Sequence, residues 1–436
     1  MADWSEHKYQ AGPAKGEFDK APEDPSPHAR KIEPWLSAAL QSEHLSLLLG
    51  SGFTSAVAHL ADTKAADMAA TVLPGRLGSK IQAHALASAT SMGRGSANIE
   101  DQMRSAMAVL EGLEIIGPAS AANTLKTTIS KQFETFLKAI VETERNISGG
   151  MECQRVASGI SLAHTCLISF LMTFASRSAS RERLNLFTTN YDRLIEFGCD
   201  QAGIRVIDRF VGAVEPVFRS SRLDVDMHYN PPGIRGEPRF LEGVVRYSKL
   251  HGSVDWSFED RRLRRVPIPF GAPEGYMGIP EDPVSTVMVY PNAAKDIETA
   301  AYPYAEIFRD FSAGLCRPNS TLFTYGYGFG DDHLNRVIAD MLTLPSTHLV
   351  VMSWDAAGGR VQRFLENFAR PAQYTLLMGS HFGDLKTLVE EYLPKPAIDT
   401  ITGRMAGLLR QRGLDLSSAP LDADMAQGEA VVDPEF

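Results

Sequence analysis

Five short, continuous apolar runs constrain the fold of this chain more than any other feature of its sequence. The runs are Leu45–Leu49, Leu184–Thr188, Val244–Leu250, Thr321–Tyr325 and Leu349–Met352, with Tyr374–Met378 as a sixth candidate. Continuous rather than alternating apolar character is typical of parallel strands that are buried on both faces. The sequence therefore predicts an α/β fold, with a Rossmann-like parallel sheet and helices on both of its faces.

Small and polar residues follow each of these runs. They include Gly-Ser-Gly after the first run, Thr-Asn-Tyr-Asp after the second and His-Gly-Ser after the third. In open α/β sheets, ligands bind outside the carboxyl ends of the strands. We therefore expect a binding site where these strand ends meet.

The stretch between the first two runs predicts helices instead of strands. Apolar residues recur there at helical spacing in Ile99–Leu113, Leu125–Val141 and Val156–Phe174. Asn98 precedes the first of these stretches and is a plausible helix N-cap, with acidic residues following it in the first turn. We expect a helical insertion over residues 60–180, which splits a core built from residues 34–59 and 181–395.

The two ends of the chain differ in composition from the rest. Residues 1–33 are rich in Pro, Lys, Asp and Glu, which predicts a flexible N-terminal arm. Residues 396–436 predict a C-terminal helix and an acidic tail. The tail, from Ser417 onward, carries Asp422, Asp424, Glu429, Asp433 and Glu435 and has no basic residue. The stretch Arg209–Gly243, rich in Pro, Gly and Arg, predicts an irregular loop region.

Charge and cysteine content exclude several classes of protein. With 43 basic and 53 acidic residues the formal net charge is −10, so direct DNA binding through a basic surface is not expected. The longest apolar stretch, Ile160–Ala175, is interrupted by polar residues, so no membrane span is expected. The four cysteines, at positions 153, 166, 199 and 316, form no C-x-x-C pair and are interpreted as reduced, mostly buried thiols of a cytoplasmic protein.

The first candidate motif is a glycine turn after the first strand. Gly50-Ser51-Gly52-Phe53-Thr54 leads into a predicted helix, and glycines allow a backbone to approach a phosphate group next to a helix N-terminus. Ser55 stands where the third glycine of a dinucleotide-binding fingerprint would be. The motif is therefore either a phosphate loop or a structural tight turn.

The second and third motifs follow the next two strands. Thr189, Asn190 and Asp192 either cap the following helix or, for Asn190, hold a water molecule or a ribose hydroxyl. His251 lies between a buried strand and Gly252, which places it at the same edge of the sheet. Histidine titrates near neutral pH and so suits general acid–base catalysis.

The fourth motif is Gly326-Tyr327-Gly328-Phe329-Gly330-Asp331-Asp332-His333. Its glycines suit close backbone contact with a ligand. The last three residues could be metal ligands, but adjacent residues rarely point at one ion, so we favour helix capping by the two aspartates.

In this order the motifs resemble those of the Sir2 family of NAD-dependent enzymes. Gly50 to Thr54 is similar to the family's G-A-G-x-S phosphate loop, and Thr189 to Asp192 to its Q-N-x-D segment. Leu250-His251-Gly252 is similar to its L-H-G, and Gly326 to Gly328 to its G-T-S ribose loop. Ser353-Trp354-Asp355, after a later strand, occupies the place of its I-N-x-E.

Two features of the protein-deacylating members are missing. Their D-F-R stretch is replaced here by Ala56-Val-Ala-His, and only Cys316 follows His251, so the four-cysteine zinc module is absent and no zinc is expected. The pattern looks more like the bacterial Sir2-like proteins of antiphage systems, which have helical insertions and degrade NAD. Those proteins are known with a hexameric HerA-type ATPase.

The resemblance implies a role for each motif in an NAD hydrolase. The pyrophosphate of NAD would lie on residues 50–54, and the adenosine ribose near residues 326–328, Ser353 and Asp355. Asn190 would orient a water or the ribose hydroxyls, and His251 would accept a proton. Thr189 and Asp192 would also bind NAD, with Asp192 binding the carboxamide or orienting the loop.

Two alternatives to hydrolysis stay open. One is an NAD-dependent protein deacylase or ADP-ribosyltransferase, and the other is a non-catalytic, nucleotide-binding subunit for a partner ATPase. The chain itself has no G-x-x-x-x-G-K-[ST] motif, so an ATPase would have to be another chain. We expect a homo-oligomer, with a HerA-type ATPase as a candidate partner and effector activity in antiphage defence by NAD depletion.

Overall fold

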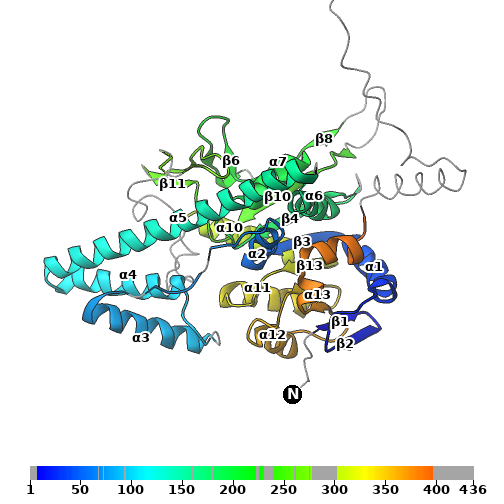
Figure 1. The fold of residues 1–436 in the computed structure, drawn as a ribbon, viewed down its shortest axis with the longest axis horizontal. Coiled ribbons are helices and arrows are strands. Elements are labelled where there is room, and N and C mark those ends of the chain that lie inside the picture. The colour runs from blue at the N-terminus through cyan, green and yellow to red at the C-terminus, as the bar shows by residue number, and fades with distance from the viewer. Residues whose placement is uncertain are drawn as a thin grey trace, which may run out of the picture. The chain divides into compact units, whose positions relative to one another are not determined.

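A nine-stranded sheet forms the centre of the computed structural model, which describes residues 7–395 except 67, 72, 93–94, 159–160, 178–179, 222–224, 230–238, 260–261, 274 and 277–301 (Figure 1). Its strand order is β2-β1-β15-β14-β13-β3-β4-β10-β5. The strands are β1 (His7–Ala11), β2 (Ala14–Phe18), β3 (His44–Leu49), β4 (Leu184–Thr188), β5 (Arg205–Ile207), β10 (Val244–Lys249), β13 (Ser320–Tyr325), β14 (His348–Ser353) and β15 (Tyr374–Met378).

The strands from β15 to β5 run parallel, and the predicted α/β fold is confirmed. All six predicted runs are strands of this sheet. The chain passes from β3 to β4, then to β5 at the edge and to β10 between β4 and β5, and it returns to β13 on the other side of β3. The point at which this order reverses, between β3 and β13, is where open α/β sheets bind their ligands.

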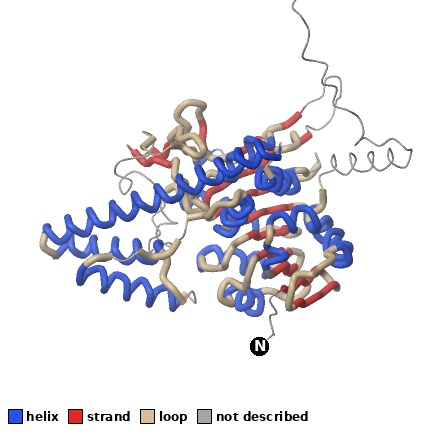
Figure 2. The backbone as a smooth tube through the Cα atoms, viewed as in Figure 1, coloured by secondary structure: helices blue, strands red, loops and turns tan. Residues whose placement is uncertain are grey.

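Helices cover both faces of the sheet, because its strands are apolar on both sides (Figure 2). One face packs against α1 (Ser26–Leu40), α2 (Ser51–Leu60), α6 (Leu162–Ala175), α7 (Leu194–Ala202), α13 (Ser380–Gly383), α14 (Leu385–Thr387) and a π-helical turn (Leu388–Tyr392). The other face packs against α10 (Tyr304–Leu315), α11 (Asp332–Thr343) and α12 (Arg360–Phe368).

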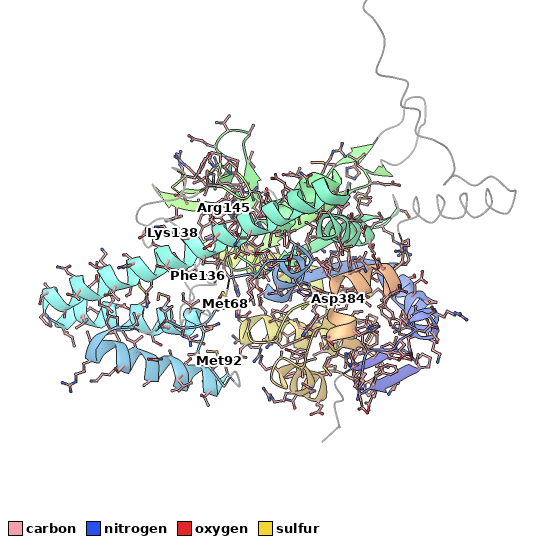
Figure 3. The ribbon with its side chains drawn as sticks, in the orientation of Figure 1. Met68, Met92, Phe136, Lys138, Arg145 and Asp384 are labelled. Atoms are coloured by element: carbon pink, nitrogen blue, oxygen red, sulfur yellow. The ribbon has the colours of Figure 1, made fainter. Side chains whose placement is uncertain are left out.

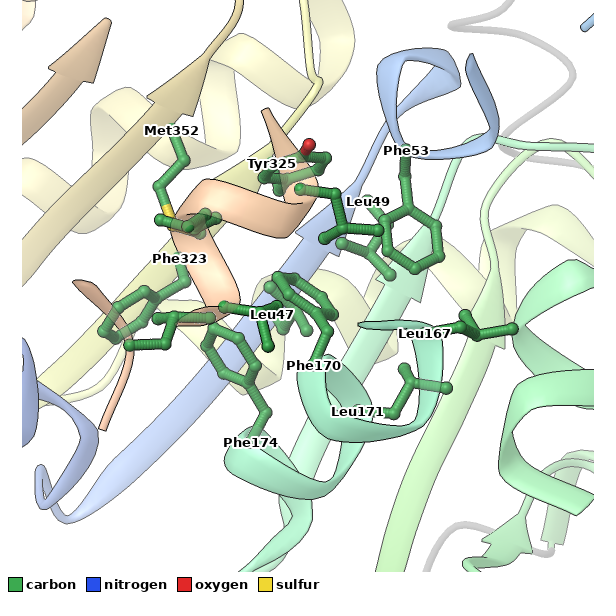
Figure 4. Packing of buried hydrophobic residues seen from close by; sticks show 14 of the residues in the cluster. Leu47, Leu49, Phe53, Leu167, Phe170, Leu171, Phe174, Phe323, Tyr325 and Met352 are labelled. Atoms are coloured by element: carbon green, nitrogen blue, oxygen red, sulfur yellow. The ribbon is translucent and has the colours of Figure 1, made fainter. Parts of the chain in front are cut away.

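Aromatic side chains connect α6 to the sheet (Figure 4). The Phe170 ring lies 5.2 Å from the Phe53 ring of α2, and the Phe174 ring lies 5.2 Å from the Phe323 ring of β13, between ring centroids. Although the sequence placed this helix within the insertion, its buried residues belong to the core of the sheet.

The insertion itself consists of α3 (Gly75–Ser91), α4 (Ile99–Ile116) and α5 (Ala119–Ser158). These helices contain the predicted stretches 99–113 and 125–141. Asn98 caps α4 as expected, since its side chain accepts a hydrogen bond from the Asp101 amide while Asp101 accepts one from the Asn98 amide. The three helices share an apolar cluster that also contains Tyr191, from the loop after β4.

The flexible arm predicted for residues 1–33 is wrong from His7 onward. Strands β1 and β2 form a hairpin, and β1 pairs antiparallel with β15. The Tyr9 side chain is 2% exposed and packs against Phe382. Burial of this apolar side chain stabilises the hairpin despite the charged composition of the segment. The charged side chains stay at the edge, where the Lys8 ammonium pairs with the Glu17 carboxylate.

Short strands occupy part of the stretch that was predicted to be irregular. They are β6 (Phe210–Val211), β7 (Val217–Phe218), β8 (His228–Tyr229) and β9 (Arg239–Phe240). Strands β6 and β7 join β11 (Trp256–Glu259) and β12 (Arg262–Arg265) in a second sheet. The predicted C-terminal helix and acidic tail at 396–436 lie outside the described residues.

The neighbouring glycines Gly149 and Gly150 on α5 predict opposite effects of the same substitution. Outside the adjacent backbone of α5, no heavy atom lies within 4 Å of a Cβ at Gly149, so Gly149→Ala should stabilise the protein by about 0.5–1 kcal/mol through its helix propensity. A Cβ at Gly150 would instead collide with the backbone oxygen of Ala61, so Gly150→Ala should destabilise by about 1–3 kcal/mol.

Urea unfolding followed by tryptophan fluorescence measures both changes. Each alanine is the control for the other, because the two positions share one helix and one chemical change. Equal effects of the two substitutions would contradict the contact between α5 and α2.

Candidate active site

Four strand ends meet around one cavity of about 240 Å³. The loops after β3, β4, β10 and β13 all contribute to its lining. The lining residues are Gly50, Ser51, Thr54, Ser55, Ala65, Ala66, Met68, Asn98, Glu100, Ile140, Thr143, Thr189, Asn190, Tyr191, Asp192, His251, Gly326, Tyr327, Gly328, Gly330, Asp331 and Arg360. The sheet thus brings together ten of the predicted site residues: Gly50, Ser51, Thr54, Thr189, Asn190, Asp192, His251, Gly326, Tyr327 and Gly328.

The two glycine loops pack directly on each other. The Gly50 amide donates to the Tyr325 carbonyl at 3.0 Å, and the Gly52 amide donates to the Gly326 carbonyl at 3.1 Å. A Cβ on Gly52 would lie 2.6 Å from the Gly326 Cα, which leaves no room for a side chain. Gly326 has a φ of +61°, a left-handed conformation that glycine adopts most readily. These glycines therefore serve the contact between the loops as well as the surface of the cavity.

Two residues of the first glycine motif do not line the cavity. Gly52 faces Gly326, as described above, and Phe53 turns into the apolar core, where its side chain is fully buried. Helix α2 begins at Ser51, so its N-terminus lies at the cavity with Ser51, Thr54 and Ser55 in the lining. The Gly52 and Phe53 amides already donate to the Gly326 and Gly50 carbonyls, so the helix dipole and the Ser51 end of the helix are what suit an anionic group here.

Asn190 connects the loop after β4 to the glycine turn. Its side-chain amide nitrogen donates to the Gly50 carbonyl and to the Thr54 hydroxyl, both at 3.0 Å. Two acceptors on that side fix the orientation of the amide, because the reverse orientation would set oxygen against oxygen. Among the described residues, no group donates to Asn190 Oδ1, so this oxygen is left for a hydroxyl or a water in the cavity.

Asp192 connects the start of α7 to the glycine turn. Its Oδ1 accepts from the Leu194 amide at 3.1 Å, at the start of α7, and its Oδ2 accepts from the Thr54 hydroxyl at 2.7 Å. The carboxylate therefore orders the turn before α7, whose N-cap residue is Arg193, and at the same time the glycine turn beside the cavity.

Two carboxylates flank His251, which is 4% exposed. Its Nδ1 lies 4.0 Å from Glu100 Oε1, and its Nε2 lies 4.0 Å from Asp331 Oδ2. Glu100 comes from the inserted helix α4, and Asp331 precedes α11. Nearby negative charge favours the protonated imidazole, so this arrangement suits a histidine that has to accept a proton.

The preference for helix capping at Asp331 and Asp332 needs correction for the first of the two. Asp331 occupies the N-cap position of α11, but its side chain makes no capping hydrogen bond. Its carboxylate points instead towards His251, and His333 stacks on the His251 ring at 5.8 Å between centroids. Among the residues that the structure describes, no group of three His, Cys, Asp or Glu side chains is placed to hold a metal ion.

Ser353 and Asp355 lie outside the cavity lining. The Ser353 hydroxyl donates to the Asp355 carbonyl at 2.7 Å, and the Asp355 carboxylate accepts from the Ala357 amide at 2.6 Å, so both residues shape the turn after β14. That turn leads to Arg360, whose Nε donates to the Gly328 carbonyl at 2.7 Å. Arg360, and not the predicted pair, brings this part of the chain to the cavity.

Several lining residues were not predicted from the sequence. Glu100 was missed because it has the pattern of an ordinary acid in the first turn of a helix. Tyr191 was missed because it lies between Asn190 and Asp192, the residues to which the motif drew attention. Burial and the charge of Glu100 raise the pKa of Tyr191 well above its ordinary value. The Tyr191 hydroxyl therefore stays protonated and donates to Glu100 Oε1 at 2.9 Å.

The described cysteines have no part in this cavity. Cys166, Cys199 and Cys316 are not joined in disulfides; the first two are buried and the third is exposed. Burial raises the pKa of Cys199 to about 12, so this thiol is inert. The side chain of Cys153 lies outside the described residues. No described helix is long and apolar enough to cross a membrane.

Comparison with known families assigns part of the chain. Residues 184–370 match the family described as the SIR2-like domain. The match begins with β4 and includes Asn190, His251 and the second glycine loop, whereas β3, the first glycine loop and the insertion precede it. No curated protein matches the chain.

Proposed function

We propose that this chain, whose residues 184–370 form a SIR2-like domain, hydrolyses NAD to ADP-ribose and nicotinamide. One observation carries the proposal: Asn190 and His251 line the same cavity as two glycine loops at the point where the strand order reverses. That is the location at which a doubly wound sheet binds a dinucleotide.

The lining supplies groups for each part of such a substrate. The N-terminus of α2 and the Arg360 side chain lie where anionic phosphates would be bound. Asn190 Oδ1 accepts a hydrogen bond from a ribose hydroxyl or a water. His251, between Glu100 and Asp331, is the residue best placed to take a proton.

Hydrolysis breaks the bond between the ribose carbon and the nicotinamide nitrogen, and the electron pair stays with nicotinamide. The oxygen of a water molecule bonds to the ribose carbon, and one proton of that water passes to His251 and then to solvent. Asn190 orients the reacting groups. Correct orientation accounts for a large part of such a rate increase, and general-base catalysis adds about 100- to 10,000-fold.

Incubation of the purified full chain with NAD tests the proposal. We expect equal amounts of nicotinamide and ADP-ribose, separated by chromatography, without any added peptide. A parallel incubation with an acyl-lysine peptide should not accelerate the reaction. Consumption of NAD only when the peptide is present would overturn hydrolysis in favour of deacylation or ADP-ribosyl transfer.

We further propose that hydrolysis serves to deplete NAD in the cell, as the effector step of an antiphage response. Measurement of the cellular NAD pool after phage infection tests this biological role separately from the chemistry. An unchanged NAD pool in infected cells that contain active enzyme would overturn it.

A further inference from the structure

The Glu100 carboxylate is buried beside His251, although it comes from the helical insertion. Only 7% of the residue is exposed, and it lines the cavity together with His251. An ordinary acid in the first turn of a helix interacts with the helix dipole from a solvated position. Burial of a carboxylate has a large free-energy cost unless other groups compensate it, so the position of Glu100 requires an explanation beyond helix stability.

Contacts from a second element hold Glu100 in place. The Tyr191 hydroxyl donates to Glu100 Oε1 at 2.9 Å, and the Tyr191 ring packs edge-on against Phe136 of α5, with 5.7 Å between centroids. Phe136 belongs to the long α5 helix and is labelled beside it in Figure 3. Tyr191 also belongs to the apolar cluster of the insertion. The loop that carries Asn190 is thus fastened to the insertion through the residue that positions Glu100.

The distance between Glu100 and His251 favours an electrostatic role. At 4.0 Å from Nδ1, Glu100 Oε1 is too far for a direct hydrogen bond but close enough to stabilise a positive charge on the ring. The other groups that face the ring are Asp331 and His333 on the α11 side and Tyr191 on the β4 side. Through Glu100 the insertion therefore contributes a negative charge to the surroundings of His251.

We propose that Glu100 is a positioning residue for His251: its carboxylate stabilises the imidazolium that forms when His251 accepts a proton, so the insertion completes the catalytic centre. This inference rests on the proposed NAD hydrolysis. Residues 184–370 contain neither Glu100 nor the first glycine loop, so the site requires parts of the chain on both sides of the start of the SIR2-like domain.

The Glu100→Gln substitution tests the role without a threat to the fold. Glutamine has nearly the same shape and still accepts the Tyr191 hydrogen bond, while a neutral amide is less costly to bury than a carboxylate. The melting temperature should therefore stay equal or rise. We expect kcat to fall about 10- to 100-fold, with KM for NAD changed less than about threefold.

The pH profile separates this role from a structural one. Loss of a negative charge beside His251 should move the acid limb of kcat/KM to lower pH, by roughly one unit. Glu100→Asp keeps the charge and should recover part of the lost kcat. Glu111→Gln, an exposed acid of the same helix, is the matched control and should behave as wild type.

Three outcomes would overturn the inference while wild-type hydrolysis stands. They are a wild-type kcat in Glu100→Gln, a loss carried wholly by KM, or an unshifted pH profile with a lowered melting temperature. A wild-type chain that fails to hydrolyse NAD would overturn the proposed function itself, and the inference with it.

Discussion

The Asn190→Ala variant is expected to lose at least about 100-fold in kcat for NAD hydrolysis while it remains folded. The substitution removes both hydrogen bonds from the side-chain amide, to the Gly50 carbonyl and the Thr54 hydroxyl, and it removes the oxygen that faces the cavity. Misplacement of a positioning group by about 1 Å is enough for a loss of this size. Release of nicotinamide by the purified variant measures the loss.

A second substitution at the same position separates orientation from folding. In Asn190→Asp the shape is kept, but a carboxylate oxygen replaces the nitrogen that donates to Gly50 and Thr54. We expect this variant to be about as inactive as Asn190→Ala, because the carboxylate cannot satisfy those two acceptors. His251→Ala should also lose about 100-fold or more, since it removes the proton acceptor. Full activity in any of these variants, with an unchanged melting temperature, would contradict the assignment.

The strand ends of the site were predictable because the fold depends on a strong local signal. Continuous apolar runs identify buried parallel strands, and parallel strands place their carboxyl ends on one edge of the sheet. Asn190 and His251 follow such strands directly, so the sequence was enough to place them together. The glycine turns were visible for the same reason.

Glu100 and Asp331 show where sequence reasoning fails. Both have the pattern of acids at the start of a helix, and only the folded chain brings them to the two sides of His251. The hydrogen bond that fixes Glu100 comes from Tyr191, which is far away in the sequence. Contacts of this kind leave no pattern in the sequence, because each of the two residues fits an ordinary role within its own segment.

The prediction of a flexible arm at the N-terminal hairpin failed for a related reason. Its charged composition is typical of a flexible segment, but β1 pairs with β15 from the opposite end of the described chain. Edge strands tolerate charged side chains because one side of each strand faces water. Composition therefore cannot distinguish an exposed edge strand from an arm without structure.

Loss of the buried ion pair between Arg193 and Glu144 should have the largest effect on stability. Glu144 lies on α5, its side chain is 1% exposed, and its Oε1 accepts from the Arg193 amide at 2.8 Å and from Nε at 3.1 Å, while Nη2 pairs with Oε2. The pair fastens the insertion beside Asp192. Arg193→Met should lower the free energy of unfolding by about 3–5 kcal/mol, because it leaves a carboxylate buried without its cation. Urea unfolding measures the loss.

The pH dependence of that loss has a definite sign. Burial raises the pKa of Glu144 above its ordinary value of 4.5, even with Arg193 present. A raised folded-state pKa means that the folded protein binds more protons than the unfolded chain, so the unfavourable contribution grows as pH rises above 4.5 and is complete above the folded pKa. Removal of Arg193 increases this contribution. The stability difference between Arg193→Met and wild type should therefore be largest at neutral pH and shrink as pH falls towards 4.5.

The double variant Arg193→Met with Glu144→Leu completes the test, since two apolar side chains of similar volume often replace a buried ion pair without a large loss. We expect it to recover most of the stability that Arg193→Met loses and to remove the added pH dependence. The part not recovered measures the hydrogen bonds from Arg193 to the Ile268 and Pro269 carbonyls together with the bond from the backbone amide of residue 193 to Glu144. A double variant as unstable as Arg193→Met alone would show that these hydrogen bonds, and not the charge of the ion pair, anchor α5 to the loop of Asp192.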